Sequence, residues 1–138
     1  MIKKGFPSVH FYDQDFVDIY DRTWAWIQDF WQRGDEKNGF QSRFFNFPDS
    51  KYLSQFETCL STFFLVYSNR IYPAAPLLDI FYAKQEDSGA IRGEYKVADG
   101  KPVKSKKNPT GVHPPLFSWA EFNLYHKIGN KKRLREIV

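Results

Sequence analysis

The stretch that decides the predicted fold runs from Pro114 to Asn130 and reads PPLFSWAEFNLYHKIGN. It has the signals of one helix, because a proline pair is tolerated in a first helical turn and Gly129 suits the left-handed backbone of a C-cap. At about 100° per residue, its large apolar residues fall on every side. Since a helix of this kind is normally covered on every side, we predict an inner helix that carries Glu121 into the interior.

Four other segments are predicted to be helical. Residues 13–33 repeat large apolar residues at spacings of three and four, which predicts an outer helix from the N-cap Asp13 to Gly34. Residues 50–68 have few charges and predict a second inner helix that carries Glu57. Residues 76–88 and 131–138 are amphipathic and predict further outer helices.

The remaining segments are expected to be loops and one hairpin. Residues 90–97 predict a short strand that turns at Asp99 and Gly100 into a return arm near residues 101–103. Arg92 and Glu94, two residues apart, would project from one face of that strand. The aromatic-rich connection 34–50 has two interpretations, a stacking or anion-holding site around Arg43 or a loop packed on the core.

The order outer, inner, outer, inner, outer is typical of stacked helical hairpins. We therefore predict a mainly all-α fold, in which antiparallel helical hairpins form part of an α/α toroid with a short β-hairpin insertion. With 138 residues the chain is long enough for one domain, residues 1–138. A closed ring of hairpins needs more helices than this, so we expect an incomplete barrel fragment.

Four stretches carry a resemblance to a known family. In order along the chain they are FETCL at 56–60, YPAAPLLDIFYAKQ at 72–85, DSGAIRGEY at 87–95, and residues 114–130. From Asp49 to Val138 the chain resembles the N-terminal part of the six-hairpin (α/α) barrel glycoside hydrolases, closest to the glucosidase-I and trehalase-like branch. The resemblance implies an inverting glycosidase that acts on or binds an α-linked sugar, such as a glucoside or trehalose.

The resemblance also implies a sugar-binding end. Phe56 and Glu57 stand where the family has a sugar-holding Trp-Asp pair, and Arg92 with Glu94 is similar to a basic-acidic pair of the family. The full set of predicted substrate-binding residues is Phe56, Glu57, Arg92, Glu94, Trp119 and Glu121. The catalytic carboxylates of the family lie in later hairpins, so the catalytic residues are unknown and we expect this chain alone to be inactive.

The chemistry of inversion needs two carboxyl groups about 6.5–9.5 Å apart. Glu57, Glu94 and Glu121 are the acids that the helix pattern places inward or near the ends of inner helices. For each of them the alternative interpretation is a structural acid, satisfied by hydrogen bonds to loop backbone or to Arg92.

Composition leaves a second function open. Apolar residues make up 42 % of the chain and aromatic residues 19 %, which excludes a disordered protein and is more than so small a domain hides easily. The alternative is therefore a non-catalytic helical module that binds carbohydrate or protein and self-associates, or that needs the remainder of a larger chain. The net charge of +4 comes from two lysine-rich clusters without interleaved aromatics, so nucleic-acid binding is not favoured.

Other function classes receive no support. The three histidines, His10, His113 and His126, lack the spacing of metal ligands, so we expect neither a metal nor another cofactor. The single cysteine, Cys59, cannot form an internal disulfide. No stretch has the length and apolarity of a membrane span or a signal-peptide core, and we expect a cytoplasmic protein without a membrane partner.

Overall fold

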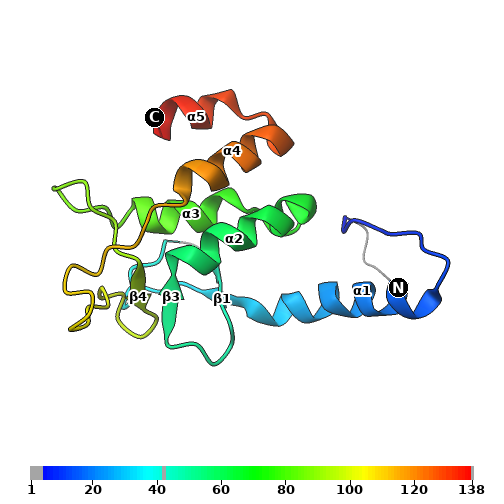
Figure 1. Cartoon of the computed structure of the whole chain (residues 1–138), viewed down its shortest axis with the longest axis horizontal. Helices are drawn as coiled ribbons and strands as arrows, with labels where there is room; N and C mark the ends of the chain where they lie inside the picture. Colours follow the sequence, from blue (N-terminus) through cyan, green and yellow to red (C-terminus); the bar gives the residue numbers. More distant parts are fainter. Residues whose placement is uncertain (1–4, 42, 138) are drawn as a thin grey trace.

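The computed structural model of the chain describes residues 5–41 and 43–137 and has a mixed α/β architecture (Figure 1). Single 3₁₀ turns follow α1 and α2, at Gln28–Phe30 and Val66–Ser68. The helices and strands are α1 (Gln14–Ile27), β1 (Trp31–Arg33), β2 (Arg43–Phe45), β3 (Tyr52–Ser54), α2 (Gln55–Leu65), α3 (Ala75–Tyr82), β4 (Glu94–Lys96), α4 (Phe117–Ile128) and α5 (Lys131–Ile137).

The prediction of an all-α toroid with one β-hairpin insertion is wrong, because the described residues form two separate antiparallel sheets. In the first sheet β1 pairs with β2, so that Trp31 lies opposite Phe45. In the second β3 pairs with β4, so that Leu53 lies opposite Tyr95. Strands of three residues are too short to show the alternation that distinguishes a strand from a helix in sequence. The segments 31–33 and 52–54 were therefore absorbed into the predicted helices.

Helix α3 is the most deeply buried element, although its pattern predicted an outer helix. Leu77, Leu78, Ile80 and Phe81 are each at most 2 % exposed. The helix packs against α2, α4 and β2, so that its short apolar run is covered by two helices and a strand. Figure 1 shows α2, α3 and α4 stacked side by side, with β3 and β4 at one end of the stack.

The two helices that were predicted to be inner, α2 and α4, each have a face in solvent. Helix α4 buries Ala120, Glu121 and Leu124 but leaves Trp119 54 % and Phe122 60 % exposed. The expectation that this helix is covered on every side is therefore wrong. Its predicted end is confirmed, because Gly129 has φ +71° and its amide donates to the Tyr125 carbonyl at 2.8 Å.

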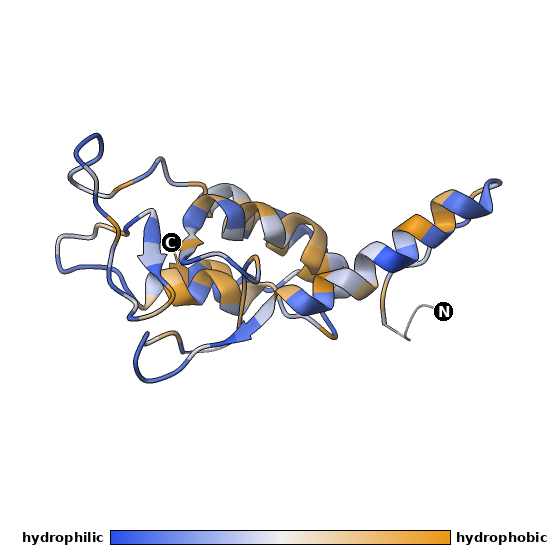
Figure 2. Ribbon diagram, turned by 90° about the horizontal axis from the view of Figure 1, so that it is seen from below, coloured by the Kyte–Doolittle hydropathy of each residue, from blue (hydrophilic) through white to orange (hydrophobic). Residues whose placement is uncertain are grey.

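Helix α1 projects from the body of the molecule (Figure 1). Its N-cap is confirmed, since the Asp13 carboxylate accepts from the Asp15 amide at 2.9 Å. Near its end Trp24 and Ile27 are buried in the core, whereas Phe16 near its start is 60 % exposed. Coloured by hydropathy, the helix shows alternating polar and apolar residues along its whole length (Figure 2). Only part of its apolar side is thus covered.

The aromatic connection between β1 and β3 is packed on the core. Phe40 and Phe44 are 3 % and 1 % exposed, and they form a buried cluster with Phe81 and Tyr95. For these side chains, the interpretation of the connection as a loop packed on the core is confirmed. Arg43 lies at the edge of the same region, with its guanidinium carbon 5.4 Å from the ring centre of Trp31.

The predicted turn after β4 is confirmed, but the strand has a second partner. Gly100 has φ +63°, and the Lys96 amide donates to the Lys101 carbonyl at 2.8 Å, as in a hairpin. The return arm forms a single bridge, between Tyr95 and Pro102. The three-residue ladder of β4 is made with β3 instead. This pairing fixes the start of α2, which follows β3 directly.

Candidate functional site

The six predicted site residues lie in three different places. Phe56 and Glu57 in α2 and Trp119 in α4 lie on the exterior of two helices that pack side by side. Arg92 lies in the loop before β4, Glu94 is the first residue of β4, and Glu121 lies in the interior. The structure therefore distributes these residues and does not gather them around one cleft. Substrate binding by them stays a prediction.

The most prominent surface feature is apolar and spans α2 and α4. We call it the α2–α4 face and define it by six side chains. From α2 and the turn after it, Phe56, Leu60 and Tyr67 are 54 %, 38 % and 55 % exposed, and at 3.6 residues per turn they share one side with Phe63. Trp119 and Phe122 come from α4. The rings of Phe63 and Trp119 lie 4.5 Å apart between their centres and join the two halves. The members of the face are Phe56, Leu60, Phe63, Tyr67, Trp119 and Phe122.

Among the described residues, the two ends of this face carry charges of opposite sign, and Arg70 lines the same hollow as Tyr67 and Lys127 at the basic end. Glu57 is exposed in the first turn of α2. Lys127 is in the last turn of α4, with its Nζ 4.7 Å from the ring centre of Tyr67. Glu57 is the sole charged residue of α2, and the one acid of α4, Glu121, is buried. The face is thus an apolar strip with an acid at one end and a base at the other.

A buried charge cluster lies on another side of α4, where Phe122 lines a hollow together with Glu121. The side chain of Glu121 is 5 % exposed. Its carboxylate accepts from the Tyr82 hydroxyl at 3.0 Å, from Arg133 Nε at 2.9 Å and from Arg133 Nη2 at 2.7 Å. Arg133 Nη2 also lies 2.9 Å from the Asp79 carboxylate and donates to the Ala75 carbonyl at 3.3 Å. The cluster therefore ties α5 to α3 and α4 through one arginine.

The titration of this cluster favours a structural role. Burial, followed by the charge of Glu121, raises the pKa of the Tyr82 hydroxyl, which therefore stays protonated and donates. Burial alone would lower the pKa of Arg133, but the hydrogen bonds to Glu121 and Asp79 outweigh it and raise that pKa. Burial and the charge of Glu121 raise the pKa of the Cys59 thiol to about 12. Near neutral pH these three groups keep their protons, so none of them can act as a base.

Two hollows flank the pair formed by Glu121 and Arg133. The first has a volume of about 160 Å³ and is lined by Leu124, Tyr125 and Leu134, among others. That volume is below the roughly 300–1,000 Å³ of a usual small-molecule site. The second, about 490 Å³, lies between α4 and α5 beside Phe117 and Ile137. Both hollows are lined in part by Leu134 of α5, a helix that buries none of its residues.

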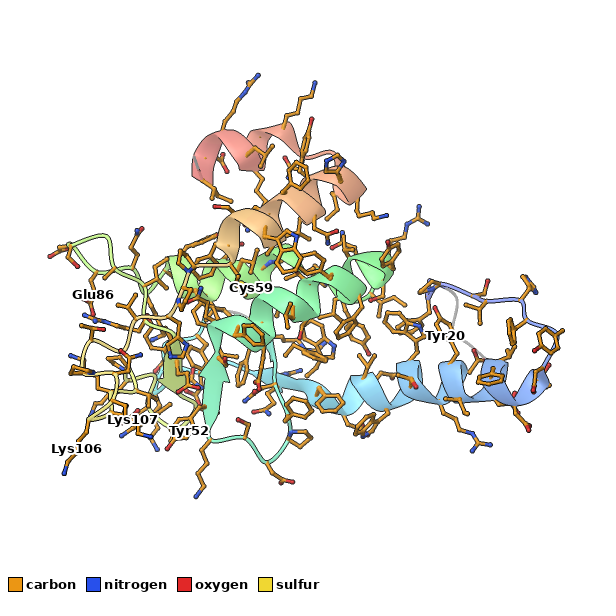
Figure 3. The ribbon with its side chains drawn as sticks, viewed as in Figure 1. Tyr20, Tyr52, Cys59, Glu86, Lys106 and Lys107 are labelled. Carbon is orange, nitrogen blue, oxygen red and sulfur yellow. The ribbon has the colours of Figure 1, made fainter. Side chains whose placement is uncertain are left out.

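Arg92 links the loop after α3 to the loop that precedes α4. Its Nε donates to Glu86 Oε1 at 2.7 Å, and its other nitrogens contact Glu86 Oε2 and the Thr110 carbonyl. The hydrogen bond from Arg92 is the main reason that the pKa of Glu86 lies below its usual range. The expectation that Arg92 shares a strand face with Glu94 is wrong, because β4 begins at Glu94, which lies opposite Ser54. Figure 3 places Glu86 among the loops at one end of the molecule, away from Cys59 in the helix stack.

Arg133 and Tyr82, the partners of Glu121, were not predicted from the sequence. Arg133 was counted with the basic residues of the C-terminal segment, and Tyr82 with an outer helix. A usable signal was present, since a carboxylate on a buried helix side requires a cation or donors from a neighbouring element. The sequence does not show which of the nearby basic residues supplies them, because Arg133 and Lys132 differ by only one position on α5.

The fold and this surface define a small mixed α/β domain with an exposed aromatic face. No family model matches the chain, and no solved structure matches it. The chain is similar to an uncharacterized protein of Borreliella burgdorferi (strain B31), with 42 % identity over 144 residues. That alignment covers all of this chain and 29 % of the relative, so the chain spans less than a third of the relative's length.

The resemblance to the six-hairpin barrel hydrolases is overturned by these findings. The described residues contain two small sheets instead of a continuous series of helical hairpins, and the similar protein carries no glycosidase description. The residues of the stretches that suggested the family have different surroundings in the structure. Within 56–60, for example, Cys59 is buried in the core, while Phe56 and Leu60 belong to the α2–α4 face.

The described residues were also searched for membrane spans. In residues 5–41 and 43–137, every helix is too short or too polar to cross a membrane.

Proposed function

We propose that this chain is a non-catalytic protein-binding module whose α2–α4 face contacts another protein surface. The observation that carries the proposal is the exposure of five large side chains on one strip, each between 38 % and 60 %. Exposed apolar patches of several hundred Å² are rare on monomeric domains and are typical of interaction sites. Aromatic side chains are also the residue type most enriched in the energetically important centre of interfaces.

A hydrolytic function has weaker support. Of the three candidate acids, Glu57 lies on the surface of α2, Glu94 lies in a sheet, and Glu121 has both oxygens bonded to Arg133 and Tyr82. A general acid or base needs a carboxyl group that can exchange a proton with substrate. Binding of an α-linked sugar to exposed rings such as Trp119 is the competing function, and it is included in the test below.

A cytoplasmic location is part of the same proposal. It is supported by Cys59, which is free and buried, so that the chain needs no oxidising compartment to fold.

The test uses a photoreactive benzophenone amino acid in place of Phe122. Expressed in cells and irradiated, this variant should give a covalent adduct with protein, because Phe122 is 60 % exposed in the middle of α4. The matched control carries the same group at Phe47, which is 54 % exposed but lies outside the α2–α4 face. Adducts at neither position, or equally at both, would contradict the proposal. Retention of the purified chain on an immobilised α-glucan, abolished by Trp119→Ala, would favour the sugar instead.

A further inference from the structure

We infer that the α2–α4 face is occupied by a second copy of this chain, packed face to face and antiparallel about a two-fold axis. In this arrangement Glu57 of one copy lies opposite Lys127 of the other. The inference rests on the proposed function, and it specifies the partner and the way that it packs. It is carried by three observations, which are the size of the face, the placement of its two charges and the position of its central rings.

The exposed apolar area has the size that a dimer needs. Large aromatic side chains have about 150–250 Å² each to bury, so the exposed fractions of the face amount to on the order of 500 Å² per copy. A standard interface buries about 800 Å² per partner, and its apolar share is roughly 60 %. The apolar part of such an interface is therefore already present on α2 and α4. The polar rim remains to be supplied by neighbouring residues.

The two charges of the face are self-complementary, because the acid of one copy can pair with the base of a second copy. Glu57 lies in the first turn of α2, and Lys127 lies beside Tyr67, just beyond the last turn of that helix. At 1.5 Å per residue, the ten residues from Glu57 to Tyr67 separate these ends by about 15 Å. A two-fold axis across the strip brings the acid of each copy to the base of the other, twice per dimer. A parallel arrangement would instead place like charges together.

The central rings lie where the axis would pass. Phe63 is six residues from Glu57 and touches Trp119, which is eight residues from Lys127. Residues near a two-fold axis meet their own counterparts, so Trp119 would pack against Trp119 of the second copy. Large aromatic side chains at the centre of an interface contribute most of its binding energy. Trp119, 54 % exposed in the free chain, would thus be desolvated by the dimer.

The exposed start of α1 is the competing occupant. Phe16 and Ile19 are each 60 % exposed, but the turns that carry them also carry Asp15 and Asp18. Docked along the strip, this acidic segment would place like charge near Glu57 at one end. A second α2–α4 face pairs both ends with opposite charge.

The experiment measures the mass of the purified chain by light scattering and sedimentation equilibrium over a range of concentrations. We expect a concentration-dependent species of twice 16.3 kDa. Phe122→Glu should raise the dimer dissociation constant by about 100-fold or more, because it places two carboxylates in an apolar contact. The control Phe47→Glu, which changes an exposed ring outside the face, should leave it unchanged.

Charge reversal tests the antiparallel register. Glu57→Lys alone and Lys127→Glu alone should each weaken the dimer about tenfold, because like charges then face each other at both ends. An equimolar mixture of the two variants should form a heterodimer with nearly the original affinity, since every opposed pair is again attractive. High salt should reduce the difference. Weakened single variants that are not rescued by mixing would overturn the register.

The outcomes separate this inference from the proposed function. A monomer at all concentrations, together with a photoadduct at position 122 to a different protein, would overturn the second copy as the occupant and keep the protein-binding role. A monomer without any adduct at position 122 would overturn both. A dimer that is insensitive to Phe122→Glu but lost on Phe16→Glu, at an exposed ring near the start of α1, would assign the contact to α1.

Discussion

Replacing Arg133 with methionine should destabilise the chain more than any other single change on α5. The substitution keeps most of the aliphatic stem but removes the three hydrogen bonds that Arg133 donates to Glu121 and Ala75, and its ion pair with Asp79. Glu121, 5 % exposed, is then left with the Tyr82 hydroxyl alone.

The magnitude follows from the burial of the pair. Removing one partner of a buried ion pair costs about 3–5 kcal/mol, because an uncompensated charge remains. Here the adjacent hollow of about 160 Å³ admits a few waters once α5 loosens, which favours the lower end of that range. We expect a loss of about 3 kcal/mol, out of the 5–15 kcal/mol typical of a whole domain.

The assay is urea unfolding, followed by circular dichroism, with Arg135→Met as the control from the exposed side of the same helix. A double variant, Arg133→Met with Glu121→Gln, removes both charges and retains an acceptor for Tyr82. It should lose only about 1 kcal/mol relative to the original chain, and thus be more stable than Arg133→Met alone. A loss below about 1 kcal/mol for Arg133→Met, or a double variant that is less stable than the single one, would refute the assignment of Glu121 and Arg133 as a coupled buried pair.

Three further outcomes are expected. Phe81→Ala, at a fully buried ring, should cost about 3–5 kcal/mol in urea unfolding, whereas Phe122→Ala should change stability by about 0.5 kcal/mol or less; comparable losses would contradict the burial of α3. Gly100→Ala should destabilise the chain far more than Gly129→Ala. Both glycines have positive φ, but a Cβ at Gly100 would lie 1.8 Å from the Asn38 carbonyl oxygen, while one at Gly129 meets nothing within 4 Å; equal unfolding midpoints would count against the close approach of these loops. The Cys59 thiol should resist alkylation in the native chain at pH 8 and react in urea. Because its pKa rises on folding from 9.0 to about 12, the unfolded chain releases this proton first, so that stability should fall above pH 9 by up to about 1.4 kcal/mol per pH unit; Cys59→Ala should reduce that slope, and an unchanged slope would be evidence against it.

Two helix termini were predicted correctly, because their signals are local. Asp13 caps α1 and Gly129 ends α4 as expected, since each feature depends on one side chain or one backbone angle. The end of α1 was placed six residues too late. Trp31 continues the helical spacing of Trp24 and Ile27, and only its pairing with Phe45 in β2 shows that it belongs to a strand.

The layers of the fold could not be predicted from amphipathicity. An all-round apolar helix was expected to be inner, and this rule assumes that the domain covers all its apolar surface. Here α4 keeps Trp119 and Phe122 in solvent, while α3, which was expected to be an outer helix, is buried. The rule does not hold for a helix that keeps apolar side chains in solvent in order to bind a partner. The two helices at which it fails, α2 and α4, are the ones that form the proposed contact face.

For the buried charge cluster, the sequence indicated the acid but not its partners. Glu121 was identified from the sequence because a single acid in an apolar helix is unusual, and the structure confirms its burial. Its partners lie 12 and 39 residues away, on α5 and α3, and no local pattern connects them. The register of such long-range contacts depends on how three helices pack, which the spacing along one helix does not determine.

The ion pair between Glu121 and Arg133 also affects how the chain can fold while it is being synthesised. At about 5–20 residues per second, the carboxylate is made roughly one second before the arginine that compensates it. During that interval α4 would have to bury a charge without its counter-ion in order to dock on α3. The nascent helix is therefore expected to stay undocked, with its aromatic residues available to chaperones, until Arg133 has left the ribosome.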